Sequence, residues 1–187
     1  HTVSGLLVFE DTLREHAQET VAALNQAGIR TVIVTGDNRE TAARIAEATG
    51  ISEMHAEMMP EEKVEIVKRF QEAGHRVAFV GDGVNDGPAL ATADVGVAMG
   101  NAGTDVAIET ADVVLLSDDL LKLPQIIDTS RKALRTIRQN LVFAVGVLLF
   151  AVCLTVFNIL TPVTGALLHE LSSIPVIANS ARLIGME

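Results

Sequence analysis

The sequence predicts an α/β domain, built as a parallel sheet with helices on both faces, followed by a two-helix transmembrane hairpin. Two observations support this fold class. Short apolar runs alternate with amphipathic segments over residues 1–118, which is typical of strands buried on both faces of a parallel sheet. Further on, the twenty residues from Leu141 to Leu160 carry no charge, and a helix of that length spans the roughly 30 Å of a bilayer.

Each element is bounded by the points where its apolar pattern starts and stops. Five apolar runs predict strands, at 5–9, 31–35, 77–81, 95–99 and 113–116. The apolar spacing between them predicts helices at 12–27, 39–49, 61–73, 87–93 and 103–109. Two of the strands run directly into Gly-Asp, and in parallel sheets ligands bind at the carboxyl ends of the strands. This coincidence is the first indication of function.

The pattern divides the chain into three regions. They are a domain at 1–118, a polar-to-basic linker helix at 119–140, and a membrane region at 141–187 with spans at about 141–160 and 163–183. A buried hairpin of a soluble protein is the alternative for the last region, but the first apolar run is too long and too uniform to favour it. Cys153 is the only cysteine, which excludes a disulfide within the chain and a cysteine-rich zinc site.

The charge is distributed unevenly along the chain, whose net charge is −10. Of the 24 acidic residues only Glu170 and Glu187 follow Ser130, whereas five of the 14 basic residues do. The acidic front half argues against nucleic acid as a partner. Basic residues precede the first span and Arg182 closes the second, which predicts that both ends face the cytoplasm. We expect a multi-pass protein of a bacterial plasma membrane, with its soluble half in the cytoplasm.

The stretch VGDGVNDGPAL, at 80–90, places Asp82 and Asp86 on a glycine-rich loop directly after a predicted strand. Carboxylates at such a position suit Mg²⁺, which uses one or two protein carboxylates together with phosphate oxygens. Asn85 would donate a hydrogen bond to a phosphoryl oxygen. The structural alternative is that Asp86 caps the next helix while Asp82 shapes a turn.

A second polar motif follows the strand at 31–35. Asp37 and Glu40 have the spacing of a capping box for the next helix. In a functional interpretation, Thr35 and the Gly36 amide would face the same phosphate pocket as the glycine-rich loop. Lys63 begins a predicted helix, where a lysine is usually only solvated; in this pocket it would supply the cation that neutralises a transferring phosphoryl group.

Together these motifs resemble the phosphorylation domain of P-type ATPases, within the haloacid-dehalogenase-like superfamily. The resemblance rests on Thr35-Gly36-Asp37, the segment from Pro60 to Lys63, the string GDGVND at 81–86, and the stretches DVGVAMG, TDVAIETADVVL and QN. It covers essentially the whole chain. The order and spacing of the motifs match the family.

The resemblance implies a role for each matching residue. Asp82 and Asp86 correspond to the Mg²⁺ site, while Thr35, Lys63 and Asn85 correspond to phosphate contacts. Gly36 and Asp37 complete the threonine-glycine-aspartate motif of the family. The residues that match the family's site motifs are Thr35, Gly36, Asp37, Lys63, Asn85, Asp82 and Asp86.

The sequence departs from the family in one respect. The family's nucleophile is the aspartate of an Asp-Lys-Thr-Gly motif, which takes the γ-phosphate of ATP, and this motif is absent. In the family it lies upstream, separated by the nucleotide-binding domain. We therefore expect a carboxy-terminal part that holds the Mg²⁺ and phosphate-stabilising half of the site. ATP would be bound mainly by a domain absent from this chain, and the chain alone would not hydrolyse it.

The second predicted span contains His169 and Glu170, with Ser172 and Ser173 close by. Ionisable groups inside a span are costly and usually functional, and imidazole suits transition metals. These four residues are therefore candidates for a transported-metal path. The alternative is a pair that snorkels to the interface or bonds to a neighbouring helix.

Two spans after the phosphorylation domain resemble the heavy-metal-transporting branch of the family. The His-Glu pair is similar to the His-Glu-Gly-Gly-Thr signature of cobalt, zinc or iron efflux, but departs from it at Leu171 and Ser172. The Ser-Ser pair is similar to the Met-x-x-Ser-Ser pattern of copper pumps, with His169 in place of methionine. The resemblance implies Zn²⁺, Co²⁺ or a similar cation as cargo, with a copper(I) pump as the alternative.

The function implied is an ATP-driven efflux pump for a transition-metal cation, with the lipid bilayer and the remainder of the pump as partners. Because the nucleophile is missing, a second hypothesis is a membrane-anchored module that binds Mg²⁺ or phosphate without catalysis. A longer reading frame upstream would discriminate between the two.

Overall fold

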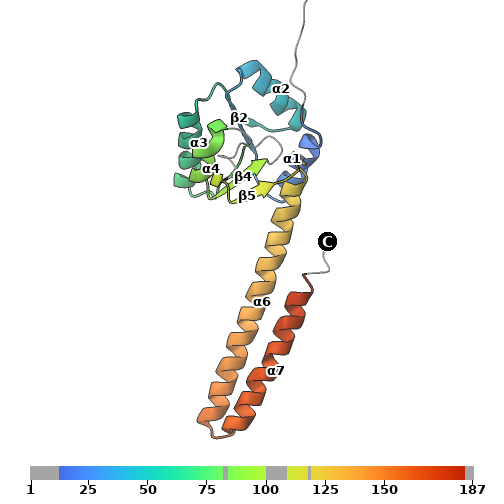
Figure 1. The fold of residues 1–187 in the computed structure, drawn as a ribbon, viewed down its shortest axis with the longest axis vertical. Helices are drawn as coiled ribbons and strands as arrows, with labels where there is room; N and C mark the ends of the chain where they lie inside the picture. Colours follow the sequence, from blue (N-terminus) through green and yellow to red (C-terminus); the bar gives the residue numbers. More distant parts are fainter. Residues whose placement is uncertain (1–12, 82–83, 100–108, 118, 184–187) are drawn as a thin grey trace, which may run out of the picture. The chain divides into compact units, whose positions relative to one another are not determined.

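The computed structural model describes residues 13–81, 84–99, 109–117 and 119–183. The chain forms two compact units, His1–Pro124 and Gln125–Glu187 (Figure 1). The predicted strand at 5–9 and nearly all of the predicted helix at 103–109 lie outside the described residues.

The first unit alternates helices and strands, as the sequence predicts. Its elements are α1 (Ala17–Gln26), β1 (Val32–Val34), α2 (Arg39–Thr49), β2 (Glu53–His55), α3 (Pro60–Glu72), β3 (Ala78–Gly81), a 3-10 turn η1 (Val84–Asp86), α4 (Gly87–Thr92), β4 (Val95–Met99) and β5 (Val113–Leu115). The predicted elements within the described residues are confirmed in type, mostly with slightly shorter bounds. The strand β2 was not predicted, because only its central residue is apolar.

All strand pairings are parallel, but the described strands form two sheets rather than one. In the first sheet, β1 pairs with β2, and Val32 lies opposite Glu53. In the second, the order is β3-β4-β5, with Val80 opposite Val97 and Val97 opposite Val113. No ladder joins β1 to β3 within the part of the chain that the structure describes.

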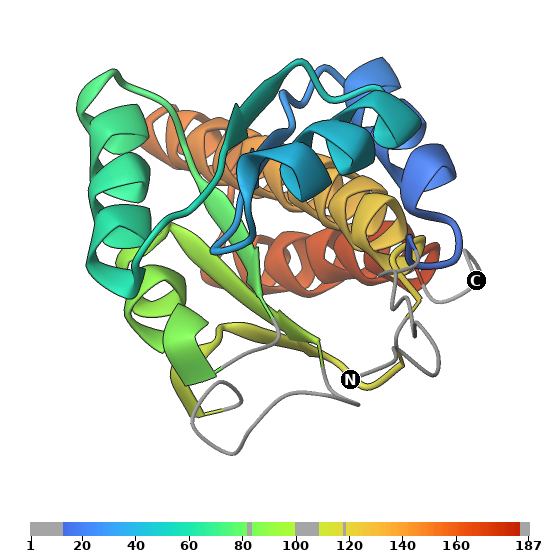
Figure 2. The ribbon, with the colours of Figure 1, turned by 90° about the horizontal axis from the view of Figure 1, so that it is seen from above.

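The three-stranded sheet buries apolar side chains on both faces, because successive residues of a strand point to opposite sides. One cluster joins this sheet to α3 and α4, which lie beside each other (Figure 2). Its buried members are Val67, Phe79, Ala89, Leu90 and Ala98. The neighbours of Ala98 in the strand point the other way. Val97, Met99 and Leu115 form a second cluster, against which Leu120 and Leu123 pack.

Helix ends follow local sequence signals, with one correction to the prediction. The N-cap of α2 is Asn38, whose Oδ1 accepts a hydrogen bond from the Thr41 backbone N–H at 2.9 Å. The predicted capping box of Asp37 and Glu40 is therefore wrong, because the cap falls one residue later. At the start of α3, the Met59 N–H donates to the Glu62 carboxylate at 2.7 Å, which satisfies one of the free donors of the first turn.

Asp94 ties the amino-terminal ends of two strands together. Its carboxylate accepts hydrogen bonds from the Val77 backbone N–H at 3.0 Å, from Arg76 at 2.5 Å and from Gln71 at 3.2 Å. These donors, the Val77 amide first, lower the pKa of Asp94 from 3.8 to about 2. These hydrogen bonds hold the start of β3 beside the start of β4, and they require the Asp94 carboxylate to be ionised.

We expect the stability of the first unit to fall when Asp94 is protonated. Because its folded-state pKa lies below the ordinary value, the stabilisation is complete above about pH 4 and is lost as the pH falls toward 2. Thermal unfolding of the wild type and of Asp94→Asn across this range checks the prediction. The variant should show the smaller change with pH, whereas Glu72→Gln, at the exposed end of α3, should keep the wild-type profile. Parallel curves for wild type and Asp94→Asn would contradict the assignment.

The second unit begins at Gln125 and contains most of α6 (Lys122–Val156) and all of α7 (Pro162–Ala181). The predicted linker helix at 119–140 and the first predicted span form one continuous helix, since no proline follows Pro124 within α6 and the helix continues through Gly146. Among the described helices, α6 alone is long and apolar enough to cross a membrane, with a mean hydropathy of 2.2 in its most apolar window. The second span at α7 remains a prediction.

Hydrogen bonds at the open end of the hairpin connect α6 to α7. The Asn140 side-chain amide donates to Ser180 Oγ at 2.8 Å, and the Asn179 amide donates to Asn140 Oδ1 at 2.9 Å. At the other end, Thr161 caps α7 by accepting the Thr164 N–H at 3.3 Å. These hydrogen bonds link one end of α6 to one end of α7, and the two helices lie side by side (Figure 1).

Candidate functional site

Thr35, Gly36 and Asp37 form a tight loop at the carboxyl end of β1. The Thr35 hydroxyl donates to Asp37 Oδ2 at 2.9 Å and accepts the Asp37 backbone N–H at 3.1 Å. Asp37 is exposed, while Thr35 is partly buried. In this structure the single hydroxyl proton of Thr35 is used by Asp37, so donation to a phosphoryl oxygen requires the hydroxyl to rotate.

This loop is joined to the segment that leads into α3. The Met58 N–H donates to the Thr35 carbonyl at 3.0 Å, and the Glu57 N–H donates to the Asp37 carbonyl at 2.8 Å. Glu57 has a φ of 60°, a left-handed conformation that is uncommon for residues other than glycine. This connection was not predicted, since neither Glu57 nor Met58 belongs to a recognisable motif.

Lys63 lies on the first turns of α3 and pairs with Asp86. Its Nζ donates to Asp86 Oδ1 at 2.7 Å, and the two side chains are only 11% and 13% exposed. A buried charge without a partner is costly, so each of these groups holds the other in place. The sequence predicted both residues for one pocket, and the structure brings them into direct contact across 23 positions.

Gly81, the last residue of β3, provides the space that Asp86 occupies. A Cβ atom at this position would lie 2.8 Å from Asp86 Cβ and 2.9 Å from Asp86 Oδ2. Glycine at this position therefore makes room for the Asp86 carboxylate, because any larger residue would displace it.

The residues present fit a hard cation such as Mg²⁺. Asp86 presents a carboxylate near the carboxyl end of β3, and its Oδ2 accepts no hydrogen bond from the described part of the chain. Such an oxygen has the donor chemistry that Mg²⁺ prefers. Asp82, the second predicted carboxylate, lies outside the described residues.

The remaining predictions for this loop are partly corrected. Asp86 occupies the N-cap position of α4, but its side chain makes no capping hydrogen bond. It is turned toward Lys63 instead, so the capping alternative is wrong. Asn85 is exposed and makes no hydrogen bond within the described part of the chain, which leaves its amide accessible to a ligand.

The four residues predicted for a metal path lie on α7. The Ser172 hydroxyl donates to the His169 carbonyl and the Ser173 hydroxyl donates to the Glu170 carbonyl, both at 2.7 Å. His169 and Glu170 are exposed. Within the described ranges, no group of three or more His, Cys, Asp or Glu side chains is arranged to hold a metal ion. The structure therefore does not assemble a complete metal site here.

The parallel strands with helices between them, and the paired Lys63 and Asp86 near the carboxyl end of β3, fit a domain of the haloacid-dehalogenase-like class. The haloacid dehalogenase-like hydrolase family matches residues 2–94. Within that superfamily, the chain is similar to P-type ATPases that are named as metal exporters, as the following relatives show.

The sequence is 46% identical over 184 residues to the zinc-exporting P-type ATPase of Mycobacterium marinum (strain ATCC BAA-535 / M), covering 98% of this chain and 25% of that protein. It is 45% identical to the manganese-exporting P-type ATPase of Mycobacterium leprae (strain TN), with the same two coverages. The fold matches a crystal structure of a zinc-transporting PIB-type ATPase in the E2·Pi state, with a TM-score of 0.89 and 39% identity, covering 93% of this chain and 28% of that one. The chain thus spans about a quarter of the length of the curated relatives it matches.

Proposed function

We propose that this chain is the carboxy-terminal part of an ATP-driven pump that exports a transition-metal cation. It supplies the Mg²⁺-binding and phosphate-stabilising half of an aspartyl-phosphate site. The observation that carries the proposal is the nearly buried pair of Lys63 and Asp86 beside Gly81, near the carboxyl end of β3. Relatives named as zinc and manganese exporters support the substrate class.

Each site residue then has a chemical task. When bound, Mg²⁺ would neutralise negative charge on the phosphoryl oxygens, with Asp86 and Asp82 as its protein ligands. Lys63 places a fixed positive charge where negative charge develops during transfer. The Gly36 amide and the Thr35 hydroxyl would position the phosphoryl group once the hydroxyl leaves Asp37, and Asn85 would donate to another of its oxygens.

The proposed cargo is Zn²⁺, Co²⁺ or a similar divalent ion. The imidazole of His169 favours such ions, and in this proposal α7 is the second membrane span, with the soluble half in the cytoplasm of a bacterium. A copper(I) pump is the second candidate, because Ser172 and Ser173 follow His169 at the spacing that resembles the copper pattern.

In the full-length protein, we expect His169→Ala to lose most metal-stimulated ATPase activity while retaining phosphorylation by inorganic phosphate. The reason is that the imidazole would bind the cargo, whereas phosphorylation from phosphate depends on the distant soluble site. ATPase rates measured across Zn²⁺, Co²⁺, Mn²⁺ and Cu⁺ check both the residue and the metal.

Ile174→Ala is a suitable control, because it truncates an exposed side chain of α7 that has no ligand atom. Metal stimulation that is unchanged in His169→Ala would exclude a ligand role. Stimulation by Cu⁺ alone would favour the copper pump.

The competing proposal is a membrane-anchored module that binds Mg²⁺ or phosphate without catalysis. A phosphoenzyme formed from Mg·ATP by the full-length protein would exclude this module, and failure to form one under any metal condition would support it.

A further inference from the structure

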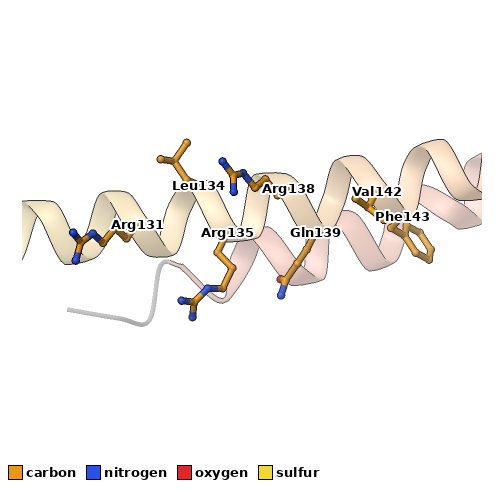
Figure 3. A pocket seen from close by; sticks show the side chains of 7 residues that line it. All are labelled: Arg131, Leu134, Arg135, Arg138, Gln139, Val142 and Phe143. Carbon is orange, nitrogen blue, oxygen red and sulfur yellow. The ribbon is translucent and has the colours of Figure 1, made fainter. Parts of the chain in front are cut away.

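One stripe of α6 changes from basic to apolar over little more than three turns. It is formed by residues spaced three and four apart, which share one face of a helix. All are exposed, and together they line an open groove of about 770 Å³: Arg131, Leu134, Arg135, Arg138, Gln139, Val142 and Phe143 (Figure 3). We call these residues the α6 stripe.

The α6 stripe changes from basic to apolar where the uncharged run begins, at Leu141. Arg138 is the last charged residue before Leu141, and Val142 lies one turn further on the same face. With a rise of 1.5 Å per residue, the guanidinium-bearing turns extend over about 10 Å and the apolar end of the stripe follows at once. If α6 crosses a bilayer, as the proposed function requires, this junction lies at the boundary between headgroups and acyl chains.

Charge pairing on α6 leaves two of these arginines available. Lys132, on another face, is paired with Asp128 at 2.7 Å. In the part of the chain that the structure describes, Arg135 and Arg138 have no carboxylate partner, and both side chains are exposed. Guanidinium groups bind phosphate through paired hydrogen bonds, and basic clusters beside a membrane helix attract anionic lipid.

We propose that the α6 stripe binds one anionic phospholipid. Arg135 and Arg138 contact the phosphate of the headgroup, and Val142 and Phe143 contact the upper part of an acyl chain. A free phosphate ion would use only the basic half of the stripe, and it would leave Val142 and Phe143, 74% and 41% exposed, uncovered. The inference therefore commits to a lipid, and it rests on the proposed membrane-spanning role of α6.

Native mass spectrometry of the full 187-residue chain in detergent tests the site by titration with two lipids of identical acyl chains. We expect phosphatidylglycerol to reach half-occupancy at a concentration about thirtyfold lower than phosphatidylcholine, a factor of about five for each arginine. Arg135→Gln/Arg138→Gln should remove this preference. Arg135→Gln alone should reduce it about fivefold and serves if the double variant does not express.

The control is Lys68→Gln/Arg69→Gln, which removes the same charge from exposed positions of α3 and should keep the preference. Equal occupancy by the two lipids, or equal loss in both double variants, would overturn the inference. Displacement of phosphatidylglycerol by inorganic phosphate would also overturn it, by assigning the arginines to a free anion. If alkaline carbonate extracts the chain from membranes, the proposed membrane placement of α6 is wrong. If the chain resists extraction but binds the two lipids equally, only the proposed lipid site is wrong.

Discussion

Asp86→Asn, introduced in the full-length protein, is expected to reduce phosphoenzyme formation from Mg·ATP by a factor on the order of a hundred to a thousand. The substitution removes the negative charge that would bind Mg²⁺. It also leaves Lys63 without the carboxylate that accepts its hydrogen bond at 2.7 Å, in a position where the lysine is only 11% exposed. Acid-stable phosphoenzyme, measured with labelled ATP as a function of Mg²⁺ concentration, gives the readout.

A stability effect must be separated from this loss of chemistry. Removing one partner of a buried ion pair costs about 3–5 kcal/mol, so unfolding of the variant should be followed in parallel. Lys63→Met provides the complementary test, because it removes the cation but keeps the Mg²⁺ ligand, and it should raise the Mg²⁺ requirement less than Asp86→Asn does. Glu65→Gln, an exposed carboxylate on the same helix, is the matched control and should have wild-type activity.

Asp82 is the second predicted Mg²⁺ ligand, and we expect Asp82→Asn to lose phosphoenzyme formation to the same extent. Normal phosphoenzyme levels in Asp86→Asn would remove the magnesium assignment. A normal level in Asp82→Asn alone would leave Asp86 as a single carboxylate ligand, a number that Mg²⁺ sites tolerate.

The order of elements could be predicted from the sequence because the strands are apolar runs that differ sharply from the helices between them. The strand β2 could not, because Glu53 and His55 flank its one apolar residue. β2 is a strand because its backbone pairs with β1, and this pairing cannot be recognised from the residue types of the segment.

The site residues could be named from motifs, but their partners could not. Spacing predicted Asp37 as the cap of α2, and the geometry places Asn38 there. Asp86 was open to both a capping role and a ligand role; its side chain makes no capping hydrogen bond and contacts Lys63, while its role as a Mg²⁺ ligand stays a prediction. Such contacts depend on how α3 packs against α4, which the periodicity of either helix alone does not determine.

Gly96→Ala is expected to destabilise the first unit by about 2–4 kcal/mol. A Cβ atom at position 96 would lie 2.6 Å from the carbonyl oxygen of Leu90 and 3.1 Å from its carbonyl carbon. Both obstacles are backbone atoms of α4, so no side chain can rotate to make room. Leu90 is itself 1% exposed, and α4 can yield only by moving away from the sheet.

The site would be affected as well, because α4 begins at Gly87, directly after Asp86. Gly96 also exchanges two hydrogen bonds with Asp112, at 2.8 and 2.9 Å, and a shift of β4 would strain both. Hydrogen exchange should therefore increase over β4 and α4, and phosphoenzyme formation should fall together with stability.

Gly146→Ala is the matched control for this substitution, since a Cβ atom there meets no atom within 4 Å and alanine favours a helix over glycine by up to about 1 kcal/mol. It should leave exchange in β4 unchanged. If Gly96→Ala unfolds at the same midpoint as the wild type, α4 and β4 can move apart without loss of stability. The close packing of Leu90 on Gly96 would then not explain how Asp86 is held beside Lys63.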